Sequence, residues 1–360
     1  MSTIAATRGV QAESPPIQRW RTRAIAGIGL CVVLLAVIIA AASVGSADIP
    51  LVTTWRIVVS KLPFVDLASG ASASAETIVI DIRLPRVLLA GLVGAALAIA
   101  GASYQGLLRN PLADPYLIGV SQGAMFGAVV GFLLPFQGEL LGIGVVPVLA
   151  FGGALLAVAI VYYLARVGKT VPVATLILAG VAVGSMFSGV SSYLILKSGE
   201  HMPGVMSWVM GQFSLTSWDE VVIVLPYVLI GALVIWLHAR ALNVLQLDEE
   251  QAEQLGVNVE RVKLVLLIVA TLMVAAAVSF CGIIGFVGIV VPHAARLLWG
   301  PDHRSLLPLS MLLGAIFLII SDTLARTLLA PTEIPVSAVT AFFGAPFFLY
   351  LLKRRTVLLW

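Results

Sequence analysis

The chain has 360 residues, of which 60% are hydrophobic and only 11% charged, and its formal net charge is +3. Soluble globular proteins carry about 25% charged residues, so this composition excludes a water-soluble enzyme, a nucleic-acid-binding protein and a disordered chain. The apolar runs are continuous and about 20 residues long, which is typical of membrane-spanning helices and not of barrel strands. The sequence predicts an all-α integral membrane protein in contact with lipid.

Residues 1–18 form a polar N-terminal tail, and a single membrane domain is expected over 19–360. A basic cluster at 19–23 precedes the first apolar run, 24–44, which is too long for the hydrophobic region of a signal peptide. We interpret this run as an uncleaved first span. Nine further runs of spanning length follow, at 86–106, 116–134, 145–165, 173–196, 221–238, 262–281, 283–299, 306–325 and 337–352. The sequence therefore predicts about ten transmembrane helices.

The stretch 262–299 is too long to be one span. As a single helix it would extend about 55 Å, whereas the hydrocarbon core of a bilayer is about 30 Å thick. Gly282, Gly285 and Gly288 interrupt the stretch. We expect the chain to turn back at these glycines and to form two spans.

The basic residues predict the orientation of the spans. With both termini in the cytoplasm, only six of the 21 Lys and Arg residues lie on the outer side: Arg56, Lys61, Arg83, Arg86, Lys197 and Arg326. Cytoplasmic loops of membrane proteins are enriched in Lys and Arg, so this orientation is favoured. The outer arginines are exceptions to the trend and need an explanation.

The predicted spans contain almost no acidic residues. Of the 18 acidic residues, only Asp322 falls within a span. Ion-coupled carriers usually bind and relay ions through intramembrane carboxylates or histidines, so the sequence disfavours a secondary transporter. Cys31 and Cys281 lie in apolar runs and His293 has no second ligand at helical spacing, so we expect no metal site.

The longest polar stretch between two spans covers residues 247–263. Asp248 and Gln251 form a capping-box pattern, and Gly256 is a typical C-terminal cap, so a short amphipathic helix is expected on the cytoplasmic face. Its expected apolar side consists of Leu247, Ala252 and Leu255. Such a helix either joins two spans as a plain surface element or binds a cytoplasmic partner.

Two groups of glycines are spaced four residues apart in the spans. Gly123, Gly127 and Gly131 form one group, and Gly180 and Gly184 form the other. Small residues at this spacing let helix backbones approach closely, so the pattern favours helix packing. Lining of a pore is the alternative.

Four segments resemble the permease subunits of ABC importers for iron chelates and cobalamin, which are type II importers. They are Ile82-Arg-Leu-Pro-Arg86; the stretch 101–121, which contains Arg109-Asn-Pro-Leu-Ala-Asp-Pro115; Gly285-Phe-Val-Gly-Ile-Val-Val-Pro-His293; and Glu333-Ile-Pro-Val336 with Phe343-Gly-Ala-Pro346. The resemblance covers nearly the whole chain after the polar tail. It is specific for the family and not for the cargo.

The resemblance implies ten transmembrane helices, with helices two to five and seven to ten related as inverted halves. It also implies a homodimer of permeases, two ABC ATPase subunits beneath it and one extracytoplasmic substrate-binding protein above it. The ATPase subunits would bind ATP and Mg²⁺, so this chain is expected to be a transport subunit without a cofactor and not an enzyme. The implied cargo is a ferric siderophore or haem, with cobalamin as the alternative and a stand-alone channel or carrier less favoured. The implied location is the cytoplasmic (inner) membrane.

The resemblance also accounts for three of the outer arginines. Arg83, Arg86 and Arg326 match arginines that pair with glutamates of the binding protein in this family. Arginine suits this task because its rigid fork binds a carboxylate bidentately. The alternative is a local pair, such as Arg83 with Asp81 or Arg326 with Asp322.

Two further sites are implied on the cytoplasmic side. In this family the coupling helices between spans six and seven, here about 247–258, insert into a groove of the ATPase. The matching residues are Leu247, Asp248, Glu249, Glu250, Ala252, Gln254, Leu255, Gly256 and Val257. The cytoplasmic gate of the family aligns with Val173 and Ala174, where apolar side chains can close a pathway by excluding water.

Overall fold

The computed structural model describes residues 16–45, 47–61, 70–136, 138–140, 142–214 and 216–353. Most of the predicted polar tail, up to position 15, lies outside the described residues, as do Arg354, Arg355 and the side chain of Arg19. The first helix, α1, begins at Pro16 and ends at Ser43, so it starts before the first span predicted at residue 24.

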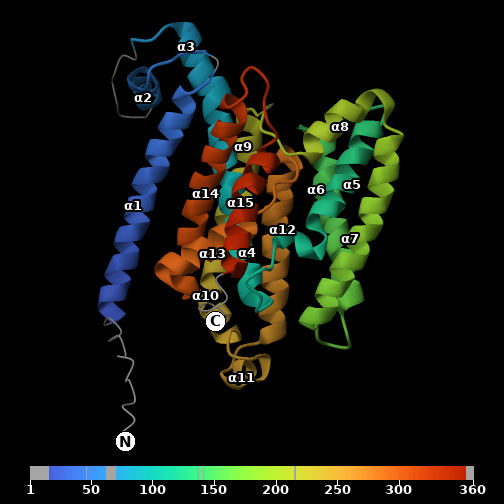
Figure 1. Ribbon diagram of the computed structural model, residues 1–360. Helices are drawn as coiled ribbons and strands as arrows, with labels where there is room; N and C mark the ends of the chain where they lie inside the picture. Colours follow the sequence, from blue (N-terminus) through green and yellow to red (C-terminus); the bar gives the residue numbers. More distant parts are fainter. Residues whose placement is uncertain are drawn as a thin grey trace, which may run out of the picture.

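Apolar helices occupy the ten predicted spans. They are α1 (Pro16–Ser43), α4 (Leu84–Leu107), α5 (Val120–Leu133), α6 (Val145–Ala165), α7 (Val173–Leu196), α9 (Trp218–Leu237), α12 (Val259–Cys281), α13 (Val287–Trp299), α14 (His303–Thr327) and α15 (Val336–Lys353). Within the described residues, seven helical stretches are long and apolar enough to cross a membrane, and α5, α13 and α15 give shorter apolar stretches. Successive spans run in alternate directions through the bundle (Figure 1).

The central helix of the bundle extends from residue 73 to residue 107 and packs against α9, α12, α13 and α14 (Figure 1). Its parts are α3 (Ala73–Thr77), the π-helical η1 (Ile78–Arg83) and α4. Gly94 and Gly101 allow its close approach to α14 and α13, because a Cβ at either position would meet the backbone of Gly314 or Gly288. Small residues thus position this helix inside the bundle.

The third predicted span is divided. The 3-10 helix η2 (Pro115–Ile118) is followed by Gly119, which has φ +85°, and α5 begins only at Val120. Asp114 caps η2 by accepting a hydrogen bond from Tyr116 N–H at 2.8 Å, so the segment before α5 forms a separate short helical turn. The divided span brings η2 beside α7.

The predicted turn in 262–299 is present. Helix α12 ends at Cys281, and α13 begins at Val287. Gly282 has φ +75°, which glycine adopts without steric cost. Phe286 also has a positive φ, +69°. Gly288 lies inside α13 and serves the close contact with α4 instead of the turn.

The short elements lie at the two ends of the bundle. One end carries α2 (Leu51–Ser60), α3, η3 (Gly199–His201), α8 (Met202–Val209) and a hairpin of β1 (Glu139–Leu140) with β2 (Ile143–Gly144). The opposite end carries α10 (Ala239–Leu245) and α11 (Glu249–Gln254), close to the turn between α6 and α7 (Figure 1).

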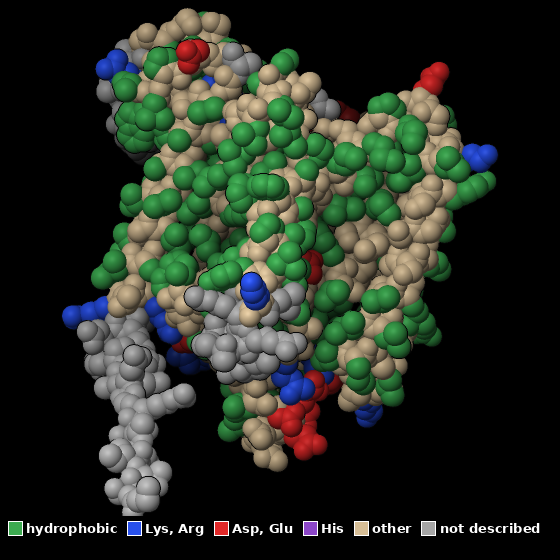
Figure 2. Space-filling model, in the orientation of Figure 1, with side chains coloured by type: hydrophobic (Ala, Val, Ile, Leu, Met, Phe, Trp, Pro, Cys, Tyr) green, Lys and Arg blue, Asp and Glu red, His purple; other side chains and the backbone are tan. Residues whose placement is uncertain are grey.

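The surface has the polarity of a membrane protein. On the face seen in Figure 2, apolar side chains cover the middle of the molecule, and most Lys, Arg, Asp and Glu side chains gather at its two ends. Large apolar side chains such as Ile25 and Leu178 are 69% and 70% exposed. Exposed apolar surface on this scale requires lipid or another protein to cover it, and the chain is a multi-pass membrane protein.

Candidate functional site

The polar segment between α9 and α12 folds into the short helix that the sequence predicts. Asp248 caps α11 by accepting a hydrogen bond from Glu249 N–H at 2.7 Å. Gly256, with φ +83°, follows the helix as its expected terminating residue. Ala252 is fully buried against the bundle, so α11 is anchored through its middle.

The expected apolar side of this helix is divided between core and surface. Ala252 points into the core, whereas Leu247 and Leu255 are 59% and 64% exposed. Leu247 precedes the cap and Leu255 follows the last helical residue, so helical spacing does not place them on one face. The two leucines leave exposed apolar surface beside the acidic residues of α11.

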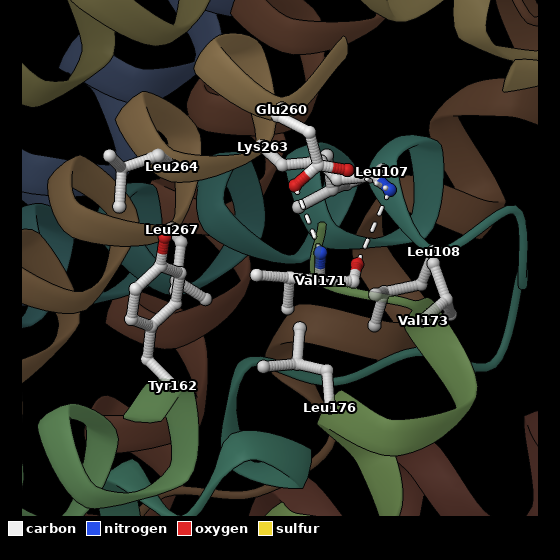
Figure 3. Close-up of a pocket in the computed structure, with 10 residues that line it drawn as sticks. All are labelled: Leu107, Leu108, Tyr162, Val171, Val173, Leu176, Glu260, Lys263, Leu264 and Leu267. Atoms are coloured by element: carbon white, nitrogen blue, oxygen red, sulfur yellow. Dashed lines mark hydrogen bonds and ion pairs between the residues drawn. The ribbon is translucent and has the colours of Figure 1, made fainter. Parts of the chain in front are cut away.

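Lys263 lies behind α11 and connects it to the core. Its Nζ donates hydrogen bonds to Glu249 on α11 at 2.8 Å, to Glu260 at 3.1 Å and to the carbonyl of Val171 at 3.3 Å. Glu260 in turn accepts a hydrogen bond from Val171 N–H at 3.0 Å (Figure 3). We call Lys263, Glu260, Glu249 and Val171 the lysine clamp.

The two predicted gate residues begin α7 directly beside this clamp. Val173 lines the same apolar pocket as Val171 and Lys263, and Ala174 is exposed (Figure 3). The other lining residues are Leu107, Leu108, Tyr162, Leu176, Glu260, Leu264 and Leu267. The start of α7 therefore contacts both the end of α4 and the beginning of α12.

The three predicted docking arginines come together at the end of the bundle opposite α11. Arg83 donates hydrogen bonds to the carbonyls of Ala42 and Ser43 at 3.1 and 2.6 Å. Arg326 donates to the carbonyls of Ala41 and Val44. Both guanidinium groups thus satisfy carbonyls at the C-terminal end of α1, where cations are favourable.

Arg86 is the centre of this group. It binds Asp322 of α14 at 2.8 Å and Glu333, before α15, at 2.9 Å. Hydrogen bonding to Arg86, followed by smaller effects of its charge and of Ser214, lowers the pKa of Glu333 against the opposing effect of burial. We call Arg83, Arg86, Arg326, Asp322 and Glu333 the arginine cluster.

One of the two local pairs considered as the alternative, Arg326 with Asp322, is present in this cluster. Arg326 lies 3.8 Å from Asp322, as one of the two local pairs requires. The side chain of Arg83 instead bonds the carbonyls at the end of α1. Arg83 and Arg86 are only 5% and 9% exposed, so both guanidinium groups act within this chain.

A cavity of about 500 Å³ opens between η2, α5 and α7. Its polar lining comes from Asp114, Tyr116, Gln122, Ser185 and Ser188, and its remaining walls from Leu117, Gly180, Val181 and Gly184. Gly180 packs against the Leu117 carbonyl, so the expected packing role of this glycine pair is combined with lining of a cavity.

Sequence reasoning missed the residues that bring chemistry to this cavity and to the lysine clamp. Asp114 belongs to a quoted motif but lies just before the third predicted span, 116–134. Lys263 and Glu260 have the i, i+3 spacing of an ordinary surface pair, yet Lys263 is 7% exposed. The one sequence signal for the burial of Lys263 was its position in the first turn of a long apolar run.

The chain matches the FecCD transport family over residues 33–354. It is 45% identical to the cobalamin import system permease protein BtuC of Halobacterium salinarum over 291 residues, which cover 81% of this chain and 77% of that protein. It is 38% identical to the hemin transport system permease protein HmuU of Yersinia pestis, with 91% and 95% covered. A solved inward-facing structure described as a metal-chelate type ABC transporter is similar with a TM-score of 0.79 and 31% identity, covering 91% of this chain and 98% of that one.

Proposed function

The chain belongs to the FecCD transport family and is a permease subunit of an ABC importer, and on that premise we propose that it moves an iron chelate, a ferric siderophore or haem, into the cytoplasm. Two copies form one pathway, two ATPase subunits bind below it and one substrate-binding protein docks above it. The ATPase subunits bind ATP and Mg²⁺, while this chain has no cofactor and makes no covalent bond with its cargo.

The observation that supports this proposal best is the separation of two charged sites by a cavity. The lysine clamp and α11 lie at one end of the bundle, and the arginine cluster lies at the other (Figure 1). The cavity between η2, α5 and α7 has polar groups and about 500 Å³ of space. An importer needs this order of parts: a docking site, a pathway and a site for its energy source.

A homodimer completes the pathway in this proposal. The α7 face beside the cavity exposes Leu178, Val181 and Met186, at 70%, 53% and 56%. One copy provides walls on one side of the cavity only, so a second copy across the α7 face would close it. The orientation in the cytoplasmic (inner) membrane, with α11 and both termini inside, is supported by the excess of basic residues at the α11 end.

The arginine cluster is proposed to dock the binding protein through its charge. Three arginines against Asp322 and Glu333 leave one net positive charge at this end. Because the guanidinium groups already bond within the chain, they would steer and orient the partner more than grip it. Glu333→Gln removes one internal carboxylate, so it should strengthen binding at low salt and lose this effect at high salt, where charges are screened beyond about 8 Å. Unchanged binding at low salt would contradict the docking role.

The gate is proposed at Val173 and Ala174. Ala174 is exposed on the first turn of α7, where a second copy could face it. Cysteine at either position should cross-link two protomers in one nucleotide state and not in the other. Cross-linking that is equal in both states would argue against a gate there.

The experiment for the whole proposal is uptake in vesicles that contain the permease, its ATPase subunits and its binding protein. Labelled ferric siderophore, haem and cobalamin are offered separately, with and without ATP. Uptake of an iron chelate that requires ATP and both partners is the expected result. Uptake without the ATPase would indicate a channel or secondary carrier instead.

Cobalamin is the second candidate cargo. It is favoured by the 45% identity with a permease named for cobalamin import. The same vesicles decide between the two, because ATP-dependent uptake of cobalamin with none of either iron chelate would assign the chain to the corrinoid.

A further inference from the structure

The lysine clamp joins two parts of the chain that the proposed function uses separately. Val171 lies in the short connection between α6 and α7, two residues before Val173, and it is 5% exposed. Both of its backbone polar groups bind side chains of α12: the N–H binds Glu260 at 3.0 Å and the carbonyl binds Lys263 at 3.3 Å. Buried backbone groups need partners, so α12 holds the backbone at Val171 in place, next to the β-bridge that Val167 and Thr170 form within the connection.

Lys263 extends the same link to α11. An ammonium group has three donors, and here all three are used, on Val171, Glu260 and Glu249. Its side chain is 9% exposed, whereas that of Glu249 is 34% exposed. The link therefore runs from a carboxylate near the surface of α11 through a buried lysine to the backbone before α7.

The apolar residues around Lys263 strengthen this link. Leu107, Leu264 and Leu267 are among the apolar residues around it, and the space left between them is only about 10 Å³ (Figure 3). Hydrogen bonds are electrostatically stronger in such apolar surroundings, and an unpaired group there is costly. A displacement of α11 away from Lys263 would thus remove one of the two carboxylates that balance a buried ammonium group.

We propose that Lys263 and Glu260 are positioning residues that transmit movement of α11 to the start of α7. This proposal rests on the proposed function, because it requires that the ATPase docks on α11. It adds that one buried ammonium group connects the docking helix to the gate, so that closure of the ATPase subunits pulls on Val171. Neither residue touches cargo or nucleotide.

The test measures cargo transported for each ATP hydrolysed, in vesicles with the full complex. Lys263→Met keeps much of the side-chain volume and removes all three hydrogen bonds. Transport per ATP should fall at least about tenfold, the effect of losing a single hydrogen bond to a charged group, while the ATPase still co-purifies through the surface of α11. Arg261→Met is the matched control, since it removes the same charge from an exposed position on the same helix, two residues away.

The results separate this proposal from a purely structural role and from failure of the proposed function. Lower thermal stability with an unchanged ratio of transport to hydrolysis would overturn it, and so would an equal ratio in Lys263→Met and Arg261→Met. If Lys263→Met does not fold, Glu260→Gln decides, because it keeps an acceptor for Val171 N–H and removes one of the two charges that hold Lys263. A ratio equal to wild type in that variant also overturns the proposal. Failure of the ATPase to bind the wild-type chain would instead contradict the proposed function.

Discussion

The arginine cluster and the lysine clamp share one arrangement around a different cation. In each, one buried cation binds two carboxylates: Arg86 binds Asp322 and Glu333, and Lys263 binds Glu249 and Glu260. The planar fork of arginine fixes the direction of its bonds, whereas an ammonium group on a flexible stem can follow a partner that moves. The comparison indicates a rigid brace at one end of the bundle and a movable link at the other.

The carboxylates differ in one member. Asp322 is 1% exposed, whereas Glu333, Glu249 and Glu260 are 39%, 34% and 28% exposed. A buried charge that loses its partner is strongly destabilising, but a carboxylate near the surface regains water. The arginine cluster should therefore contribute to the stability of the fold, and the lysine clamp to the transmission of movement from α11 to α7.

Arg86→Met should have the largest effect, and it tests whether the arginine cluster stabilises the fold. It leaves Asp322 buried without its closest cation, so the free energy of unfolding should fall by about 3–5 kcal/mol. Unfolding in detergent, by heat or denaturant, measures the change. Lys61→Met is the control, because the Lys61 side chain is 55% exposed in its pair with Glu76, and an exposed pair contributes at most about 1 kcal/mol. Equal effects of the two variants would mean that Arg86 is no brace.

The next effect concerns binding and not folding. Leu255→Asp adds a charge to the exposed apolar surface beside α11, and the affinity for the ATPase should fall about 30-fold, as for a central interface residue. Thermal stability should stay within about 0.5 kcal/mol of wild type, because the residue is on the surface. We leave Gly256 unchanged in this test, since its φ of +83° would strain any other residue. Leu329→Asp, equally exposed near the opposite end, is the control and should bind the ATPase normally.

Arg86→Lys sharpens the comparison between a fork and an ammonium group. Lysine keeps the charge but cannot bind Asp322 and Glu333 bidentately, so we expect a loss of about 1–2 kcal/mol, between wild type and Arg86→Met. The same unfolding measurement reports it. A variant as stable as wild type would show that charge alone holds the cluster together.

The smallest effect is the pH dependence of the brace. Arg86 holds the pKa of Glu333 below its usual value, so the folded state gains stability above the unfolded pKa of about 4.3 and loses it as the pH falls through the lower folded pKa. Because the Glu333 side chain is 39% exposed, the gain should be under about 1 kcal/mol. Glu333→Gln should flatten the stability curve below about pH 4.3, compared with the exposed control Glu139→Gln. An unchanged curve would show that Glu333 does not contribute to the stability of the arginine cluster.

Much of the fold follows from the sequence because its determinants are local. The length of each apolar run gives a span, the glycines near 282 give a turn, and Asp248 with Gly256 delimits α11. A cap or a turn depends on residues within a few positions of it, so a single sequence contains the information. The division of the third span at Gly119 was missed, because apolar character continues through it.

The long-range charge contacts were decided by the tertiary structure alone. Arg86 and Asp322 are 236 residues apart, and Lys263 and Val171 are 92 apart, so no periodicity predicts their contact. The cavity likewise needs Asp114 beside Ser185, on segments that only packing brings together. The sequence by itself determined how many apolar spans form, since this depends on hydrophobic length, and its basic residues predict their orientation. It left open which helix faces meet, because apolar spans in lipid are placed by the fit of small residues such as Gly94 against Gly314 and not by hydrophobicity.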